Sequence, residues 1–185
     1  MDAVAAGLDR LMNLIERPGG GEFAAFYASY VSLVPESDIM RVLEGQAADV
    51  RLQTRAFVPK REEFRYAPGK WSVREVLGHM TDAERVFGFR AFCFSRGDEN
   101  PLPGFDENDY VARSGFDRCG LTDLVDAFGR VREANLTALR RFDDDAWLRM
   151  GTASGQPVSV RALAYIMAGH VRHHLHILST RYGGV

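Results

Sequence analysis

The sequence contains few cysteines and no excess of basic charge. Its 185 residues include only two cysteines, Cys93 and Cys119, and these do not form a C-x-x-C pair. This usage favours a cytoplasmic location with reduced thiols. The net charge is −2, and acidic and basic residues are interspersed along the chain. The sequence therefore lacks the basic stripe or charged tail that is typical of nucleic-acid-binding proteins.

Long apolar runs are also missing. No stretch approaches the roughly 20 apolar residues that a membrane-spanning helix needs. The first residues, MDAVAAGLDRLMNLIERPGGGE, have no basic start and carry acids through their apolar part, unlike a secretory signal. We therefore expect neither a membrane nor a nucleic acid as a partner. The hydrophobic content of 46% and charged content of 26% are typical of a globular domain.

Helical periodicity dominates the chain, and the alternation typical of strands is scarce. The glycines of PGGGE interrupt a first amphipathic stretch, because glycine is unfavourable inside a helix. Residues 1–21 are therefore predicted to form a loosely attached helical leader, and residues 22–185 a single domain. A second short helix is expected in EFAAFYASYVSLV, which ends before Pro35.

Four longer helical patterns follow, at about residues 38–57, 73–94, 122–142 and 160–182. Serines are expected to cap three of them, namely Ser37, Ser72 and Ser159. Ser72 also forms a capping-box pattern with Glu75. Four long helices in one domain predict an all-α four-helix bundle. The connection formed by residues 95–120 is acidic and unusually long, which is typical of a functional loop.

Histidine is rare, yet four of the five histidines lie in the segment GHVRHHLH. His170 and His174 stand four residues apart on the apolar stripe of the last helix, so both are predicted to face the core. His79 occupies the same kind of position on the second long helix. The spacing of the pair lets two imidazoles reach one metal ion. Three inward histidines therefore predict a metal site inside the bundle, with a coordination position left open as in catalytic zinc sites.

Other interpretations of the histidines stay open. Buried histidines can form a hydrogen-bonded polar network without any metal. Burying three imidazoles without partners costs about 1–3 kcal/mol each, which favours a metal. His173 and His176 are interpreted as surface or supporting residues. Gly78 and Gly169, each next to an inward histidine, are expected to let helices approach closely or to admit a ligand.

Three segments in this order resemble the DinB-like superfamily, also called DinB/YfiT-like metalloenzymes: PGKWSVREVLGHMTDAERVF, PLPGFDENDY and GQPVSVRALAYIMAGHVRHHLHIL. The resemblance covers about residues 23–182 and implies a bundle of up-down-down-up topology, often homodimeric. In that family one histidine of the second bundle helix and an H-x-x-x-H pair of the last helix bind a divalent metal, usually zinc or nickel. The matching positions are His79, His170 and His174.

Members of that family include thiol transferases, mycothiol-dependent isomerases and proteins described as hydrolases. We therefore expect a metal-dependent thiol S-transferase or hydrolase that acts on a small electrophile, with a low-molecular-weight thiol as a possible second cofactor. Asp82 and Asp106 are weaker candidates for a proton acceptor or a fourth ligand, and Tyr110 for a substrate contact. Acids are usually solvated surface residues, and Glu84 is expected to point away from the site. The alternative is a non-catalytic homodimeric bundle that binds a metal or a small ligand.

Overall fold

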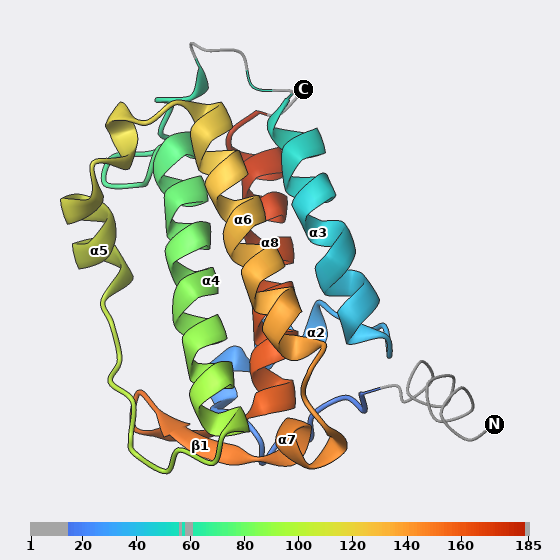
Figure 1. Ribbon diagram of the computed structural model, residues 1–185. Coiled ribbons are helices and arrows are strands. Elements are labelled where there is room, and N and C mark those ends of the chain that lie inside the picture. The colour runs from blue at the N-terminus through green and yellow to red at the C-terminus, as the bar shows by residue number, and fades with distance from the viewer. Residues whose placement is uncertain (1–14, 56, 58–60, 184–185) are drawn as a thin grey trace.

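The computed structural model describes residues 15–183, apart from residues 56 and 58–60. Its main elements are four long helices, α3 (Ile39–Thr54), α4 (Val73–Ser95), α6 (Leu121–Leu139) and α8 (Val160–Arg181). The chain runs upward along α3, downward along α4 and α6, and upward along α8 (Figure 1). Helices α4 and α3 each pack against both α6 and α8. The predicted four-helix bundle and its up-down-down-up topology are confirmed.

Two of the three predicted serine caps are confirmed. Ser72 and Glu75 form the complete capping box at the start of α4, and Ser159 accepts a backbone hydrogen bond at the start of α8. The prediction of Ser37 as a cap is wrong, because Asp38 caps α3 by accepting a backbone hydrogen bond of 3.0 Å. A carboxylate at this position also interacts favourably with the positive end of the helix dipole.

The connections contain more regular structure than the sequence patterns predict. The short helix expected before Pro35 is confirmed as η1 (Ala25–Tyr27) followed by α2 (Ala28–Ser32). The long acidic connection holds α5 (Glu107–Ser114) and η3 (Phe116–Arg118). Between α6 and α8 lie α7 (Asp144–Leu148) and the hairpin of β1 (Met150–Ala153) and β2 (Gln156–Ser159), which close the lower end of the bundle in Figure 1.

The described part of the leader is held against the domain. Ile15 packs on the core, and Arg17 donates hydrogen bonds of 2.8 and 2.7 Å to the backbone carbonyls of Val34 and Val31. These contacts differ from the loose attachment expected from the glycines. Residues 1–14, where most of the leader helix is expected, lie outside the described residues, and the domain boundary stays a prediction.

The apolar core consists of two clusters stacked along the bundle. On α8 the change from one cluster to the other falls between Ala168 and Val171, and on α4 it falls between Met80 and Ala83. His170 therefore lies where the two clusters meet. Within the described ranges, no helix is both long enough and apolar enough to traverse a lipid bilayer.

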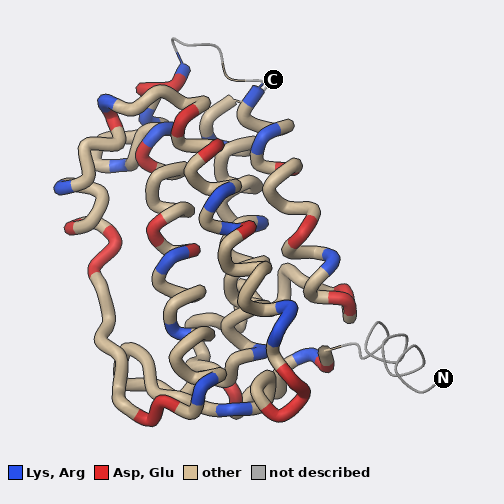
Figure 2. The backbone as a smooth tube through the Cα atoms, viewed as in Figure 1, with Lys and Arg blue, Asp and Glu red and all other residues tan. Residues whose placement is uncertain are grey.

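Charged residues of both signs are spread over the helices and connections (Figure 2), but one ion pair is buried in the interior. Arg132 donates to both carboxylate oxygens of Glu84, at 2.7 and 2.8 Å, and the two side chains are 1% and 2% exposed. Arg132 also donates to Gln46 at 2.8 Å, and Gln46 donates to the Ala168 carbonyl of α8 at 2.7 Å. Glu84 does not join the histidine cluster, and it is buried rather than a solvated surface acid.

Candidate metal centre

Three buried histidines meet in the middle of the bundle. His79 comes from α4, and His170 and His174 come from α8. One ring nitrogen of each lies within 4.8 Å of the others, and the His170 Nε2 is 3.0 Å from the Nε2 of both neighbours. The three side chains are buried, so the inward orientation predicted from the apolar stripes is confirmed. Their role as ligands stays a prediction.

Hydrogen bonding among these rings does not satisfy all three nitrogens. A neutral imidazole nitrogen carries either one hydrogen or one lone pair, never both. The His170 Nε2 can therefore make a full hydrogen bond to only one of its two neighbours at 3.0 Å. Three converging lone pairs do fit a divalent cation, for which imidazole is a common ligand. The donor set of the cluster thus suits a metal better than a polar network.

The surroundings keep these imidazoles uncharged. Burial, with a smaller contribution from His173, lowers the pKa of His79 from 6.5 to about 4. Burial and then the neighbouring histidines hold the pKa values of His170 and His174 well below 6.5. Neutral rings at physiological pH leave their lone pairs available, as metal binding requires.

Aromatic rings enclose the cluster. The ring centres of Tyr30 and Phe87 lie 5.5 and 5.8 Å from that of His170, both in edge-on orientation. The Trp71 ring lies 4.6 Å from the His79 ring. These contacts shield the cluster from water and leave access on the His174 side.

Glycines permit this close packing. A Cβ atom at Gly169 would collide with the backbone carbonyl of Tyr30, so the absence of a side chain lets α2 approach α8 beside the histidine pair. A Cβ atom at Gly78 would collide with the ring of Phe116 from η3. The expectation that these glycines allow close approach is confirmed.

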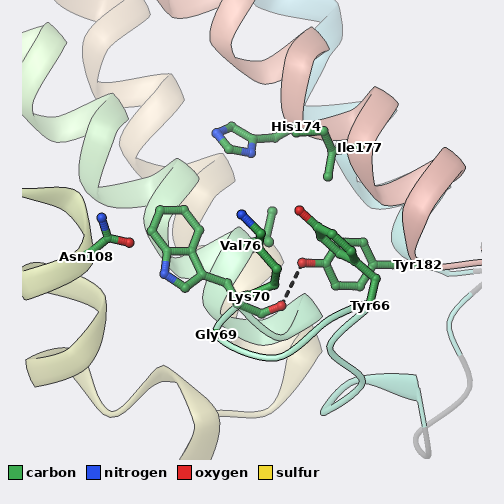
Figure 3. A pocket seen from close by; sticks show the side chains of 9 residues that line it. Tyr66, Gly69, Lys70, Val76, Asn108, His174, Ile177 and Tyr182 are labelled. Atoms are coloured by element: carbon green, nitrogen blue, oxygen red, sulfur yellow. Dashed lines mark hydrogen bonds between the residues drawn. The ribbon is translucent and has the colours of Figure 1, made fainter.

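A cavity of about 210 Å³ reaches the cluster at His174 (Figure 3). Aromatic and aliphatic side chains form most of its wall. The lining residues are Tyr66, Gly69, Lys70, Trp71, Val76, Asn108, His174, Ile177 and Tyr182. His79 and His170 do not line it, so His174 is the member of the cluster that faces a bound molecule.

The three weaker candidates from the sequence do not line this cavity. Asp82 pairs with Arg85 at 3.0 Å, and Asp106 caps α5 by accepting two backbone hydrogen bonds. Tyr110 is 49% exposed, and its ring packs against Phe105. The acidic connection does reach the cavity, but through Asn108 of α5.

The other two histidines of the last helix lie outside the cluster. His173 is half-buried, with its ring centre 5.3 Å from that of Tyr30 and 5.1 Å from that of His174. His176 is exposed. Their predicted placement, at the surface or supporting the site, agrees with this geometry.

Comparison with known proteins agrees with the fold. The family model of the DinB superfamily matches residues 51–178, which is more than half of the sequence. The chain belongs to the DinB superfamily. The resemblance noted in the sequence is therefore confirmed, and all three clustered histidines of this DinB-superfamily protein lie inside the matched region.

A solved structure of similar fold is that of YfiT from Bacillus subtilis, described as a probable metal-dependent hydrolase with an unusual four-helix bundle topology. The TM-score is 0.69 at 16% sequence identity, and the match covers 91% of this chain and 94% of YfiT. At this identity the likeness shows the fold alone. No curated protein matches the sequence.

The sequence analysis missed most of the cavity wall of this DinB-superfamily protein. Lys70 and Trp71 stand in the segment PGKWS, which served as a helix start and as part of the family resemblance, without either residue being assigned to the site. Tyr66 and Tyr182 are far apart in the sequence, and no local pattern connects them. Tyr30 precedes the matched region, and its place beside His170 has no signal in the sequence beyond an aromatic residue on a short helix.

Proposed function

We propose that the protein is a divalent-metal-dependent enzyme that hydrolyses a small electrophile or transfers a thiol to it. The observation that carries this proposal is the convergence of three neutral, buried imidazoles at the end of a solvent-reaching cavity. Among the described residues, no aspartate, glutamate or cysteine joins the cluster. Three protein ligands with an open position are typical of catalytic rather than structural zinc sites.

The chain's own side chains would hold and shield the reacting groups. His79, His170 and His174 would be the ligands. Tyr30 and Phe87 would exclude water beside His170, where the cavity does not reach, and Trp71 would cover the His79 ring from the cavity wall. When bound, such a metal supplies a nucleophile at neutral pH, because it lowers the pKa of a coordinated water or thiol. No carboxylate lines the described cavity, so the chain offers no side-chain carboxylate as a general base there.

Hydrolysis and thiol transfer differ in the nucleophile, which is water in one case and a low-molecular-weight thiol in the other. The fold likeness to YfiT, described as a probable metal-dependent hydrolase, supports the hydrolytic form. The family resemblance stated from the sequence supports thiol transfer equally. Zinc or nickel as the metal, a homodimer and a cytoplasmic location stay predictions.

The test is a screen of small esters, amides and haloaromatic electrophiles, each with and without added cysteine or glutathione. The full chain is assayed as the zinc form, the nickel form and the chelated form. We expect turnover only in a metal form, and a loss of at least about 100-fold in the His170→Ala, His174→Ala variant. The exposed His176→Ala variant is the matched control and should keep full activity. Equal turnover after chelation would refute the proposal.

The non-catalytic alternative makes a different prediction about the metal. Cobalt substitution gives a visible spectrum that responds to ligands. An open coordination position predicts a spectral change when cysteine or azide is added. A spectrum unchanged by either ligand would indicate a closed structural site and favour the alternative.

A further inference from the structure

The cavity beside His174 has one charged side chain in its wall, that of Lys70. Nearby acids have other partners, since Glu75 pairs with Arg65 and Glu62 pairs with Arg74. Within the described part of the chain, Lys70 forms no ion pair. In Figure 3 its amine projects into the space below His174 rather than away from the wall. A cation that faces a cavity without a counterion suits an anionic ligand.

The position of Lys70 is fixed by its backbone. The residues before it form a turn in which the Lys70 nitrogen donates to the Ala67 carbonyl at 3.2 Å. Pro68 and Gly69 occupy the centre of this turn, and Gly69 has a φ of 74°, as the third residue of a type II turn requires. Arg65 donates to the Lys70 carbonyl at 2.8 Å. With both backbone groups bonded, the side chain leaves the turn at a defined place.

The cavity wall contains a second hydrogen-bond donor, the Tyr66 hydroxyl. The Tyr66 hydroxyl lies on the His174 side of the cavity in Figure 3, and Tyr66 lines the same cavity as Lys70. The Tyr182 hydroxyl, in contrast, is committed to the Trp71 carbonyl at 2.6 Å, and its ring meets the Tyr66 ring edge-on with centres 5.1 Å apart. Tyr182 thus braces the wall, while Tyr66 remains able to donate a hydrogen bond to a ligand.

The rest of the wall is mostly apolar, with Asn108 as a further polar side chain. Trp71, Val76 and Ile177 offer flat and aliphatic surface between the two donors and His174. The volume of about 210 Å³ is below the 300–1,000 Å³ typical of sites for drug-sized ligands. The ligand is therefore a small molecule with an apolar body.

We propose that this cavity binds a small organic carboxylate, with its carboxylate on Lys70 and Tyr66 and its apolar or aromatic body against Trp71 and Ile177. This assignment rests on the proposed function in treating the carboxylate as part of the substrate, whose reactive end then lies beside His174. A neutral or cationic substrate of the same shape would form no ion pair with the exposed Lys70 ammonium group and would bind more weakly.

The experiment measures binding of 4-fluorobenzoate by fluorine NMR, with 4-fluorobenzamide and 4-fluorobenzylamine as the neutral and cationic probes. The full chain is used as purified and again after chelation, because a carboxylate can also coordinate a metal. The variants are Lys70→Met and Lys70→Arg. Arg130→Met is the matched control, since Arg130 is exposed on α6 and does not line the cavity.

We expect 4-fluorobenzoate to bind about tenfold more tightly than the two other probes, with and without chelation. The Lys70→Met change should abolish this preference, whereas Lys70→Arg should retain part of it and Arg130→Met all of it. The inference is overturned if Lys70→Met binds the carboxylate as the parent does, or if chelation alone abolishes binding. Lys70-dependent binding in a protein that takes up no metal would support this inference and refute the proposed function. Metal-dependent turnover without any preference for the carboxylate would support the proposed function and overturn this inference.

Discussion

The buried ion pair between Arg132 and Glu84 should contribute strongly to the stability of the bundle around the histidines. The Arg132→Met change removes two hydrogen bonds, of 2.7 and 2.8 Å, from a carboxylate that is 2% exposed. Asn135 would still donate to Glu84 at 2.9 Å, but no cation would compensate the charge. Gln46, which ties α3 to α8, would also lose its bond from Arg132.

The expected cost follows from the burial of both charges. Removing one partner of a buried ion pair destabilises a protein by about 3–5 kcal/mol, because the remaining charge is left uncompensated. For a chain of this size, such a loss lowers Tm by about 6–20 °C. The Arg132→Met, Glu84→Met double variant removes both charges, so it should cost only about 1–3 kcal/mol. The two single changes are therefore expected to be strongly non-additive.

The assay is urea unfolding of the metal-free full chain at pH 7, followed by circular dichroism, for the parent, both single variants and the double variant. Arg130→Met, on the exposed face of the same helix, is the control and should change stability by less than about 0.5 kcal/mol. A cost below about 1 kcal/mol for Arg132→Met would refute the reasoning. Additivity of the two single changes would refute it as well.

Three further predictions concern the packing of the domain and the wall of the cavity. Gly169→Ala should destabilise the protein by about 1–3 kcal/mol, because the new methyl group meets α2 backbone, whereas Gly129→Ala in α6 meets nothing within 4 Å and should stabilise it by about 0.5–1 kcal/mol. The hydrogen bond from Arg161 lowers the pKa of Glu22 from 4.5 to about 2, so the parent should lose stability relative to Glu22→Gln as the pH falls from 4.5 to 2. Tyr182→Phe removes a hydroxyl that braces the wall and should cost about 1 kcal/mol in thermal unfolding.

Each of these predictions has a result that contradicts it. Equal changes in stability for Gly169→Ala and Gly129→Ala would show that the α2 backbone moves aside at no cost in free energy. Parallel pH profiles for the parent and the Glu22→Gln variant would show that the carboxylate is not stabilised in the folded state. An unchanged Tm in Tyr182→Phe would show that its hydrogen bond does not hold the wall.

The sequence predicted the long helices and the clustered histidines because both depend on local periodicity. The capping box of Ser72 and Glu75 lies within four residues, and the stripe that carries His170 and His174 lies on one helix. His79 was found in the same way on its own helix. Each of these features needs no knowledge of the partner helix, so a single sequence is sufficient for it.

Features formed by residues far apart in the chain could not be predicted. Glu84 has the sequence context of a surface acid, and its partner Arg132 lies 48 residues away. The Tyr182 hydroxyl donates a hydrogen bond to the carbonyl of Trp71, which lies 111 residues earlier in the chain. The small hairpin was missed for a different reason. Strands of four residues are too short to show a recognisable alternation of apolar and polar residues.

The central claim is that His79, His170 and His174 hold a divalent metal ion, and metal stoichiometry tests it most directly. The full chain is purified without a histidine tag, incubated with zinc or nickel, passed through a desalting column and measured by elemental analysis. The account predicts close to one metal ion per chain in the parent and in His176→Ala, and almost none in the His170→Ala, His174→Ala variant. A parent chain that retains neither metal, or a double variant that retains as much as the parent, would contradict it.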